Sequence, residues 1–184
     1  MKYNQEIEYK MLLTQPQFNL LQSFYPDFKA IKQKNIYYDS LIQPLHIRKM
    51  GMRIRDIENC HEFTLKVKNE YGHMEYNVLV ASNSVYALQQ PDIVALFNQF
   101  EIIGPFKAIG ELTTWRTLIP LNEGDLCLDC NQYNGRIDYE VEFEVTKDSD
   151  KGMKELIQVL KQAELSYIPN KKSKIARCLH SIKQ

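Results

Sequence analysis

The stretch NGRIDYEVEFEV, residues 134–145, alternates between polar and apolar side chains after an Asn-Gly pair. Because strand side chains point alternately to two faces, one face of this segment is acidic and the other is apolar. An Asn-Gly pair beside an alternating run is typical of the two-residue turn of a β-hairpin. The stretch therefore predicts a strand over 135–146 that pairs with a strand over 124–133.

Further alternating runs fill most of the chain, and several are separated by turn-forming residues. The runs expected to be strands are 3–13, 34–41, 46–56, 60–69, 72–80, 106–119, 124–133 and 135–146. Eight antiparallel strands are enough to close a barrel, which leaves no strand edge unpaired. The predicted fold class is α+β, mainly antiparallel β, built as an eight-stranded closed β-tunnel.

Four segments have apolar residues at helical spacing. They follow Thr14, begin at Pro91–Asp92, run from 149 to 164, and run from 172 to 183. We expect these amphipathic helices to pack outside the barrel, where they cover its apolar outer face. The sequence has no internal repeat, linker or low-complexity segment, so the prediction is one domain over residues 1–184.

The composition is that of a soluble globular protein. Of the 184 residues, 44% are hydrophobic and 25% are charged, and the 23 basic and 23 acidic side chains give a net charge of +0. This balance gives no bulk attraction to nucleic acid or to an anionic membrane, and neither is expected as a partner. The chain shows no leader pattern and no bilayer-spanning apolar run, so we expect a cytoplasmic protein. A homodimer is compatible with the sequence, which contains nothing that tests it.

Cysteine and histidine give little support to a metal site of the zinc-finger type. Cys127 and Cys130 form a C-x-x-C pair, but no second pair has the spacing of a structural zinc site. Buried or half-buried thiols in a strand are the favoured interpretation. The four histidines show no H-x-x-x-H spacing, and none is assigned to a metal.

Charges of opposite sign are segregated by strand. The segment 138–144 is acidic, RIR at 53–55 and TLKVK at 64–68 are basic, and EIEYK at 6–10 carries both signs on one face. A solvated sheet face usually mixes signs, because like charges two residues apart repel. Solvated faces of a two-layer sheet are one interpretation. The other is that these faces point inward around a charged ligand.

An inward arrangement would suit a metal-bound polyphosphate. Arg and Lys bind phosphate oxygens, whereas carboxylates beside them would repel phosphate unless a divalent cation lies between. Mg²⁺ is commonly bound by one or two carboxylates together with substrate phosphate oxygens. The expected cofactor is therefore Mg²⁺, or Mn²⁺ in its place, and the expected ligand is a polyphosphate.

The segment Glu6-x-Glu8-x-Lys10 resembles the ExExK signature of CYTH domains, the triphosphate tunnel metalloenzymes named after a class of adenylyl cyclase and thiamine triphosphatase. The resemblance covers almost the whole chain in order. It continues through YYD (37–39), RIR (53–55), TLKVK (64–68), LTTWR (112–116), Asp129, DYEVEFE (138–144) and KKSKIAR (171–177). It implies an eight-stranded tunnel that binds a triphosphate and a divalent metal.

Carried over residue by residue, the resemblance implies a set of site residues. The implied metal ligands are Glu6, Glu8, Glu140 and Glu142. The implied phosphate-binding residues are Lys10, Arg53, Arg55, Lys66, Lys68 and Arg116, with Lys174 near one mouth of the tunnel. Lys10, Arg55 and Glu142 are the residues expected to be catalytic. Asp129, Glu144 and Glu75 lie on faces that also suit the interior.

The expected function is divalent-metal-dependent hydrolysis of a triphosphate by in-line attack of water on the terminal phosphorus. Inorganic triphosphate is the favoured substrate, because a wall that is charged along most of its length needs no organic group to recognise. Two alternatives within the family are a thiamine triphosphatase, with stacking from Tyr37, Tyr38 or Trp115, and an adenylyl cyclase, for which no stretch offers an adenine pocket. The alternative that is not an enzyme is a non-catalytic module that binds polyphosphate or a nucleotide.

Overall fold

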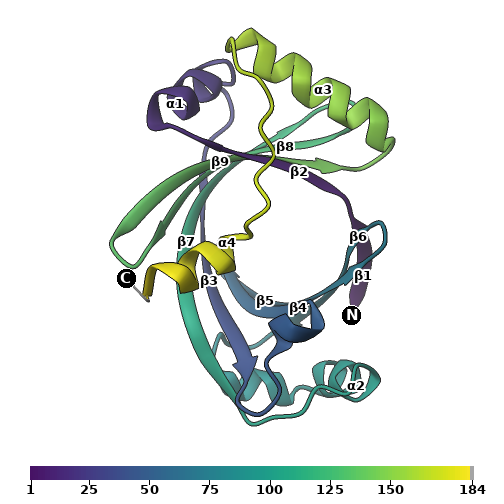
Figure 1. The fold of residues 1–184 in the computed structure, drawn as a ribbon. Helices are drawn as coiled ribbons and strands as arrows, with labels where there is room; N and C mark the ends of the chain where they lie inside the picture. Colours follow the sequence, from purple (N-terminus) through teal and green to yellow (C-terminus); the bar gives the residue numbers. More distant parts are fainter. Residues whose placement is uncertain (183–184) are drawn as a thin grey trace.

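One strongly curled antiparallel sheet and four α-helices make up the computed structural model, which describes residues 1–182 (Figure 1). The strands are β1 (Lys2–Glu6), β2 (Glu8–Leu13), β3 (Ile31–Ser40), β4 (Met50–Ile57), β5 (Cys60–Asn69), β6 (Gly72–Val80), β7 (Phe106–Pro120), β8 (Gly124–Tyr133) and β9 (Arg136–Val145). Their order across the sheet is β1-β6-β5-β4-β3-β7-β8-β9-β2. The predicted fold class is confirmed as α+β with mainly antiparallel strands.

The expected closed barrel of eight strands is corrected to a curled sheet of nine strands within the described residues. The run predicted at 3–13 is divided at Ile7. On one side of Ile7, β1 pairs with β6, and on the other side β2 pairs with β9. The two edge strands are therefore consecutive in the chain, and Figure 1 shows them meeting where the curl comes round. The two edges are joined by the polypeptide chain itself at Ile7, and not by a hydrogen-bonded ladder between β1 and β2.

Most other boundaries agree with the sequence patterns. The strands predicted at 60–69, 72–80 and 124–133 have the bounds of β5, β6 and β8. The strand predicted at 46–56 begins later, because a 3₁₀ helix, η1 (Leu45–Arg48), follows Pro44. A second 3₁₀ helix, η2 (Val85–Gln89), precedes α2.

The four α-helices are α1 (Gln15–Ser23), α2 (Pro91–Gln99), α3 (Ser149–Gln162) and α4 (Lys174–Ile182). Thr14 and Gln17 form a capping box at the start of α1, and Asp148 caps α3 by accepting a hydrogen bond from the Lys151 amide. The last residue predicted for the fourth helix, 183, lies outside the described residues. None of the helices described is long and apolar enough to cross a membrane.

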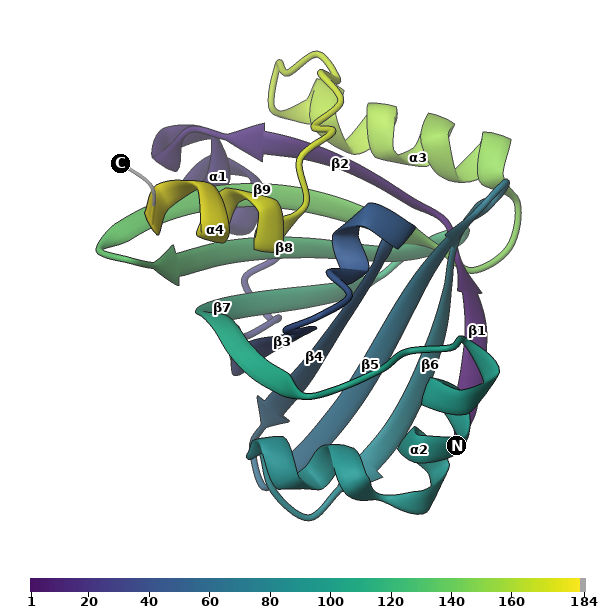
Figure 2. The ribbon, with the colours of Figure 1, turned by 60° about the horizontal axis from the view of Figure 1, so that its bottom comes forward.

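Three helices cover the convex face of the sheet, as predicted. Helices α1 and α3 pack over one half, where Leu21 and Leu156 join Phe143 of β9 in an apolar core. Helix α2 packs over the other half, where Leu96 meets Phe63 of β5. Figure 2 shows α3 and α2 on opposite sides of the molecule, each against its own part of the sheet. Apolar side chains thus face outward to the helices, and the alternate, polar side chains face inward.

Helix α4 departs from the prediction, because it lies on the concave side of the curl (Figure 1). Its Cys178 packs with Tyr37, Leu112 and Tyr133 in a small apolar cluster. Ile175, near the start of the helix, lines the central cavity. The first residues of α4 therefore reach into the polar interior that the other three helices enclose from outside.

The start of β8 offers a test of how tightly the sheet packs. A methyl group at Gly124 would lie 2.3 Å from the Glu144 carbonyl oxygen and 2.7 Å from the Phe143 ring, whereas one at Gly51 would meet nothing within 4 Å. We expect Gly124→Ala to lower the free energy of unfolding by about 1–3 kcal/mol, through overpacking. Gly51→Ala, the control, should change it by no more than about 0.5 kcal/mol. Urea denaturation of both variants measures the difference, and equal stabilities would contradict this account.

Candidate active site

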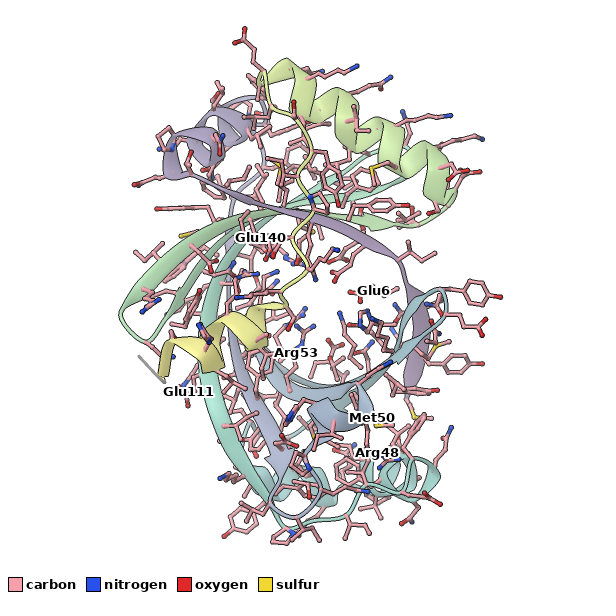
Figure 3. All side chains as sticks on the ribbon, in the orientation of Figure 1. Glu6, Arg48, Met50, Arg53, Glu111 and Glu140 are labelled. Atoms are coloured by element: carbon pink, nitrogen blue, oxygen red, sulfur yellow. The ribbon has the colours of Figure 1, made fainter. Side chains whose placement is uncertain are left out.

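The curled sheet encloses a cavity of about 220 Å³ whose wall is rich in charged side chains. Figure 3 shows Glu6 and Arg53 on the inner side of the curl. Nine of the residues predicted from the sequence line this cavity: Glu6, Glu8, Lys10, Arg53, Arg55, Lys66, Arg116, Glu142 and Lys174. Glu75 and Glu144, for which an interior position was considered, line it as well. The inward interpretation of the charged faces is confirmed for these residues.

Strand register places opposite charges beside one another on the inner face. Lys10 of β2 lies opposite Glu142 of β9. Likewise, Arg116 of β7 lies opposite Asp129 of β8. Such cross-strand pairs lie close enough for their side chains to interact directly. Charges that are separated by strand in the sequence are therefore paired across neighbouring strands in the fold.

Arg116 is the centre of the ion pairs on one side of the cavity. Its guanidinium binds the Asp129 carboxylate through Nε at 2.9 Å and Nη2 at 2.8 Å. It also contacts Glu142 at 2.5 Å and Glu144 at 2.6 Å. Asp129 has no solvent-exposed surface. Because an unpaired buried carboxylate is very costly, Arg116 offsets part of the cost of burying Asp129 and Glu142.

Lys174 supplies a second cation to the same carboxylates, from the first residue of α4. Its Nζ lies 2.6 Å from Glu142, 2.9 Å from Asp129 and 3.2 Å from Glu140. Burial opposes ionisation of Glu142, but the Lys174 ammonium and the Arg116 guanidinium outweigh it and hold the pKa of this carboxyl well below its ordinary value. The position of α4 on the concave side therefore has an electrostatic cause.

Glu140 and Lys68 are placed differently from the other predicted site residues. Glu140 has no exposed surface, and its two oxygens accept hydrogen bonds from Arg177 Nη1 at 3.1 Å and Nη2 at 2.8 Å. Asn170 donates a further hydrogen bond to Glu140 at 2.9 Å. Neither Glu140 nor Lys68 is among the residues that line the cavity, and Lys68 is exposed. Arg177 and Asn170 were missed because a contact with a distant strand leaves no local pattern.

Lys66 is the centre of a second group of ion pairs, where β1 meets β6. Its Nζ lies 2.5 Å from Glu6 and 3.2 Å from Glu75. Close by, Lys10 pairs with Glu8. Burial, which the Lys66 ammonium only partly offsets, raises the pKa of Glu6 to about 7. For Glu75, Lys66 and Arg53 together outweigh burial and lower the pKa. Burial, and not the absence of a positive partner, is therefore what disfavours the ionised form of Glu6.

His73 of β6 is a neighbour of this group that the sequence interpretation did not assign. Its Nδ1 lies 3.9 Å from Glu6 Oε2, and one ligand atom from each of Glu6, Glu8 and His73 lies within 4.8 Å of the others. Burial, and then the Lys66 charge, lower the pKa of His73. The signal was available, because His73 shares an alternating face with Glu75, two residues along the strand.

Two arginines on β4 have donors directed to the cavity. Both Arg53 and Arg55 line it. Arg53 Nε is buried and has no hydrogen-bond partner among the described residues. Arg55 donates from Nε to the Asn35 side chain at 3.2 Å. A buried donor without an acceptor costs free energy, so Arg53 is suited to an anionic ligand that would satisfy it.

Neutral polar side chains complete the wall. Gln33 and Asn35 of β3, with Thr64, Asn77 and Thr114, line the same cavity. Thr64 donates to the Asn77 side chain at 2.8 Å. Of the aromatic residues considered for stacking, Tyr37 lines the cavity, whereas Tyr38 lies in the outer apolar core.

The fold and this charged interior together define a known class of protein. Residues 4–179 match the model of the CYTH domain, and the chain belongs to the CYTH family. It is 27% identical over 177 residues to the Bacillus subtilis (strain 168) protein named "Putative triphosphatase YjbK", an alignment that covers 92% of this chain and 90% of that protein.

Solved structures agree with the family assignment. A protein from Bacillus halodurans, described as a putative adenylate cyclase, superimposes with a TM-score of 0.83 at 31% identity, over 96% of this chain and 98% of that one. A protein from Hippeastrum, named a putative adenylyl cyclase, superimposes with a TM-score of 0.76 at 21% identity, over 96% of each chain. The second likeness concerns the fold alone.

Removal of the central cation should destabilise the fold in a pH-dependent way. We expect Arg116→Met to lower the free energy of unfolding by about 3–5 kcal/mol at pH 7, because it leaves Asp129 and Glu142 with Lys174 as their one remaining salt-bridge partner among the described residues. The depressed pKa of Glu142 contributes stability that is present above the ordinary value of 4.5 and is lost as the pH falls through the folded-state value. The difference in free energy of unfolding between variant and wild type should therefore become smaller below pH 4.5. Urea denaturation at several pH values measures this difference.

A matched control is Lys34→Met. Lys34 pairs with Glu111 at 2.9 Å, but both side chains are well exposed, at 42% and 57%. Exposed ion pairs contribute about 0–1 kcal/mol, so this variant should remain close to wild type at every pH. Equal losses in the two variants would contradict a special role for the buried network.

Substitution of the two acids that share Lys66 should have opposite effects. Because the pKa of Glu6 is raised to about 7, its ionisation costs stability as the pH rises from 4.5 through 7. Glu6→Gln should therefore be more stable than wild type at pH 8 in the presence of chelator, and equal to it near pH 4.5. The pKa of Glu75 is lowered, so Glu75→Gln should be less stable than wild type at pH 8. Calorimetry at both pH values tests the pair, and shifts of the same sign would contradict this assignment.

Proposed function

We propose that the chain is a divalent-metal-dependent triphosphatase that hydrolyses inorganic triphosphate by in-line attack of water on the terminal phosphorus. The observation that carries this proposal is the cavity itself, in which cations and carboxylates from seven strands face one another. The Bacillus subtilis relative is named a triphosphatase, which supports the same activity. We further propose that residues 1–184 act as one catalytic domain.

The basic residues are proposed to bind the phosphate chain. Arg53 and Arg55, whose neighbours leave donors available, would take phosphate oxygens through their planar guanidinium groups. Lys10, Lys66, Arg116 and Lys174 pair with acids of the site and would share their charge with the substrate. Lys68 would act only at the mouth, since it is exposed. The role of these groups is positioning and charge stabilisation, with no covalent chemistry on the protein.

The carboxylates fit a divalent cation. Glu6 Oε2 is buried and accepts no well-formed hydrogen bond, although Lys66 lies nearby. We propose Glu6, Glu8 and Glu142 as residues that would hold Mg²⁺ or Mn²⁺. When bound, the cation would neutralise charge on the terminal phosphate. Glu140 remains a predicted ligand, but a metal there would have to displace hydrogen bonds from Arg177 and Asn170.

Cavity size and lining favour inorganic triphosphate over a nucleotide. Pockets for larger organic ligands usually have volumes of roughly 300–1,000 Å³, with mostly apolar walls. The cavity here is smaller, about 220 Å³, and many of its lining residues are charged. Of the three aromatic residues considered for stacking, Tyr38 donates its hydroxyl to the Asn83 carbonyl, and Trp115 lies beneath the Lys32 ammonium. Adenylyl cyclase activity is kept as the second candidate, because the Bacillus halodurans relative is described in those words.

Phosphate release from a substrate panel tests the proposal. We expect rapid release from inorganic triphosphate with Mg²⁺ or Mn²⁺, slower release from thiamine triphosphate and ATP, and none with chelator. Formation of a cyclic nucleotide and pyrophosphate from ATP would favour the cyclase instead. Binding of triphosphate without turnover in any metal would overturn the proposed enzyme and favour a polyphosphate-binding module.

Glu142 is the residue whose substitution should affect turnover most directly. We expect Glu142→Gln to lower metal-dependent phosphate release by on the order of 100-fold, because one proposed carboxylate ligand of the cation is lost while the shape of the side chain is retained. Glu111→Gln is the matched control, since Glu111 is exposed and outside the cavity lining. Circular dichroism establishes that both variants are folded. An unchanged rate in folded Glu142→Gln would refute this assignment.

A further inference from the structure

His73 lies beside the two N-terminal carboxylates at the place where β1 gives way to β2. It occupies the β6 position directly opposite Glu6 in the strand register. It also lines the central cavity, together with Glu6 and Glu8. The two acids come from opposite sides of the bend at Ile7, so the bend is what brings them and the imidazole to one point.

The spacing of these groups suits a shared ion better than direct bonds. His73 Nδ1 is 3.9 Å from Glu6 Oε2, which is too long for a hydrogen bond. Two ligand atoms that each lie about 2.1 Å from one ion are about 3.0 Å apart at a right angle and about 4.2 Å apart when opposite. The observed separation falls within this range. One ligand atom from each of the three residues lies within 4.8 Å of the others, so small side-chain movements would suffice to complete the set.

A cation already lies at this point. Glu6 Oε2 is buried, and the Lys66 ammonium lies 2.5 Å from it. Lys66 also contacts Glu75, at 3.2 Å. Lys66 would therefore keep a carboxylate partner if an ion took its place at Glu6.

The donor set distinguishes between ions. Mg²⁺ prefers oxygen ligands in near-octahedral geometry and is seldom bound by imidazole. First-row transition cations accept imidazole nitrogen together with carboxylate oxygen. One imidazole and two carboxylates therefore favour a transition cation at this point.

We propose that His73, together with Glu6 and Glu8, binds a first-row transition cation, and that Mn²⁺ is preferred over Mg²⁺ at this position. The proposal rests on the metal-dependent function proposed above and specifies its ion. His73 is a metal ligand in this scheme, so its loss changes the affinity for the ion and the ion preference before it changes the chemistry on phosphate.

Mn²⁺ binding to the full chain without substrate tests the inference. Pulsed EPR of the Mn²⁺-loaded wild type should show coupling to an imidazole nitrogen, and His73→Gln should remove it. By titration calorimetry, His73→Gln should weaken Mn²⁺ binding by on the order of tenfold or more, and Mg²⁺ binding by less. His46→Gln is the matched control, because His46 is exposed on η1 and outside the cavity lining.

The outcomes separate this inference from the proposed function. Mn²⁺ bound to the wild type without nitrogen coupling would overturn the role of His73, and so would equal Mn²⁺ affinities in wild type and His73→Gln. An absence of Mn²⁺ binding without substrate would overturn it as well. In each case the triphosphatase proposal is tested separately, by phosphate release alone. The wild-type EPR spectrum needs no variant, so a misfolded His73→Gln would leave the test intact.

Discussion

Buried carboxylates inside the curled sheet must be matched by cations, and the arrangement of the molecule follows from this requirement. Asp129 and Glu140 have no exposed surface. Arg116 reaches Asp129 from within the sheet, whereas Lys174 and Arg177 reach Asp129 and Glu140 from the C-terminal helix. Because removing one partner of a buried pair leaves a very unfavourable charge, α4 is held on the concave side of the sheet by its cations. Arg116 and Lys174 also form part of the cavity wall.

Much of this architecture could be predicted from local sequence. Alternation of charged and apolar residues is a property of a single strand, and it determines which side chains face inward wherever the strand lies. The strand bounds at 60–69, 72–80 and 124–133 follow from turn-forming residues beside such runs. The inward position of Arg53, Lys66 and Glu142 follows in the same way.

Other features could not be predicted, because they depend on contacts between distant segments. Isoleucine is common in strands, and no residue near Ile7 in the sequence indicates that the paired strand changes from β6 to β9. In the sequence, Arg177 has the pattern of a solvent-exposed helix residue. Its partner Glu140 lies on a strand that is distant in the sequence. His73 was overlooked for a different reason. His73, Glu6 and Glu8 lie on three different strands, so no spacing within one segment of the sequence relates all three.

The division of the first strand at Ile7 also governs when the sheet can be completed. Glu8 of β2 pairs with Glu144 of β9, which lies far from it in the sequence. Pairings between residues so distant in sequence are slow to form, because a long loop must close first. Pairing of β2 therefore depends on β9, whereas β1 needs only β6, which is much nearer to it in sequence. The strands on either side of Ile7 thus join the sheet at different stages of folding.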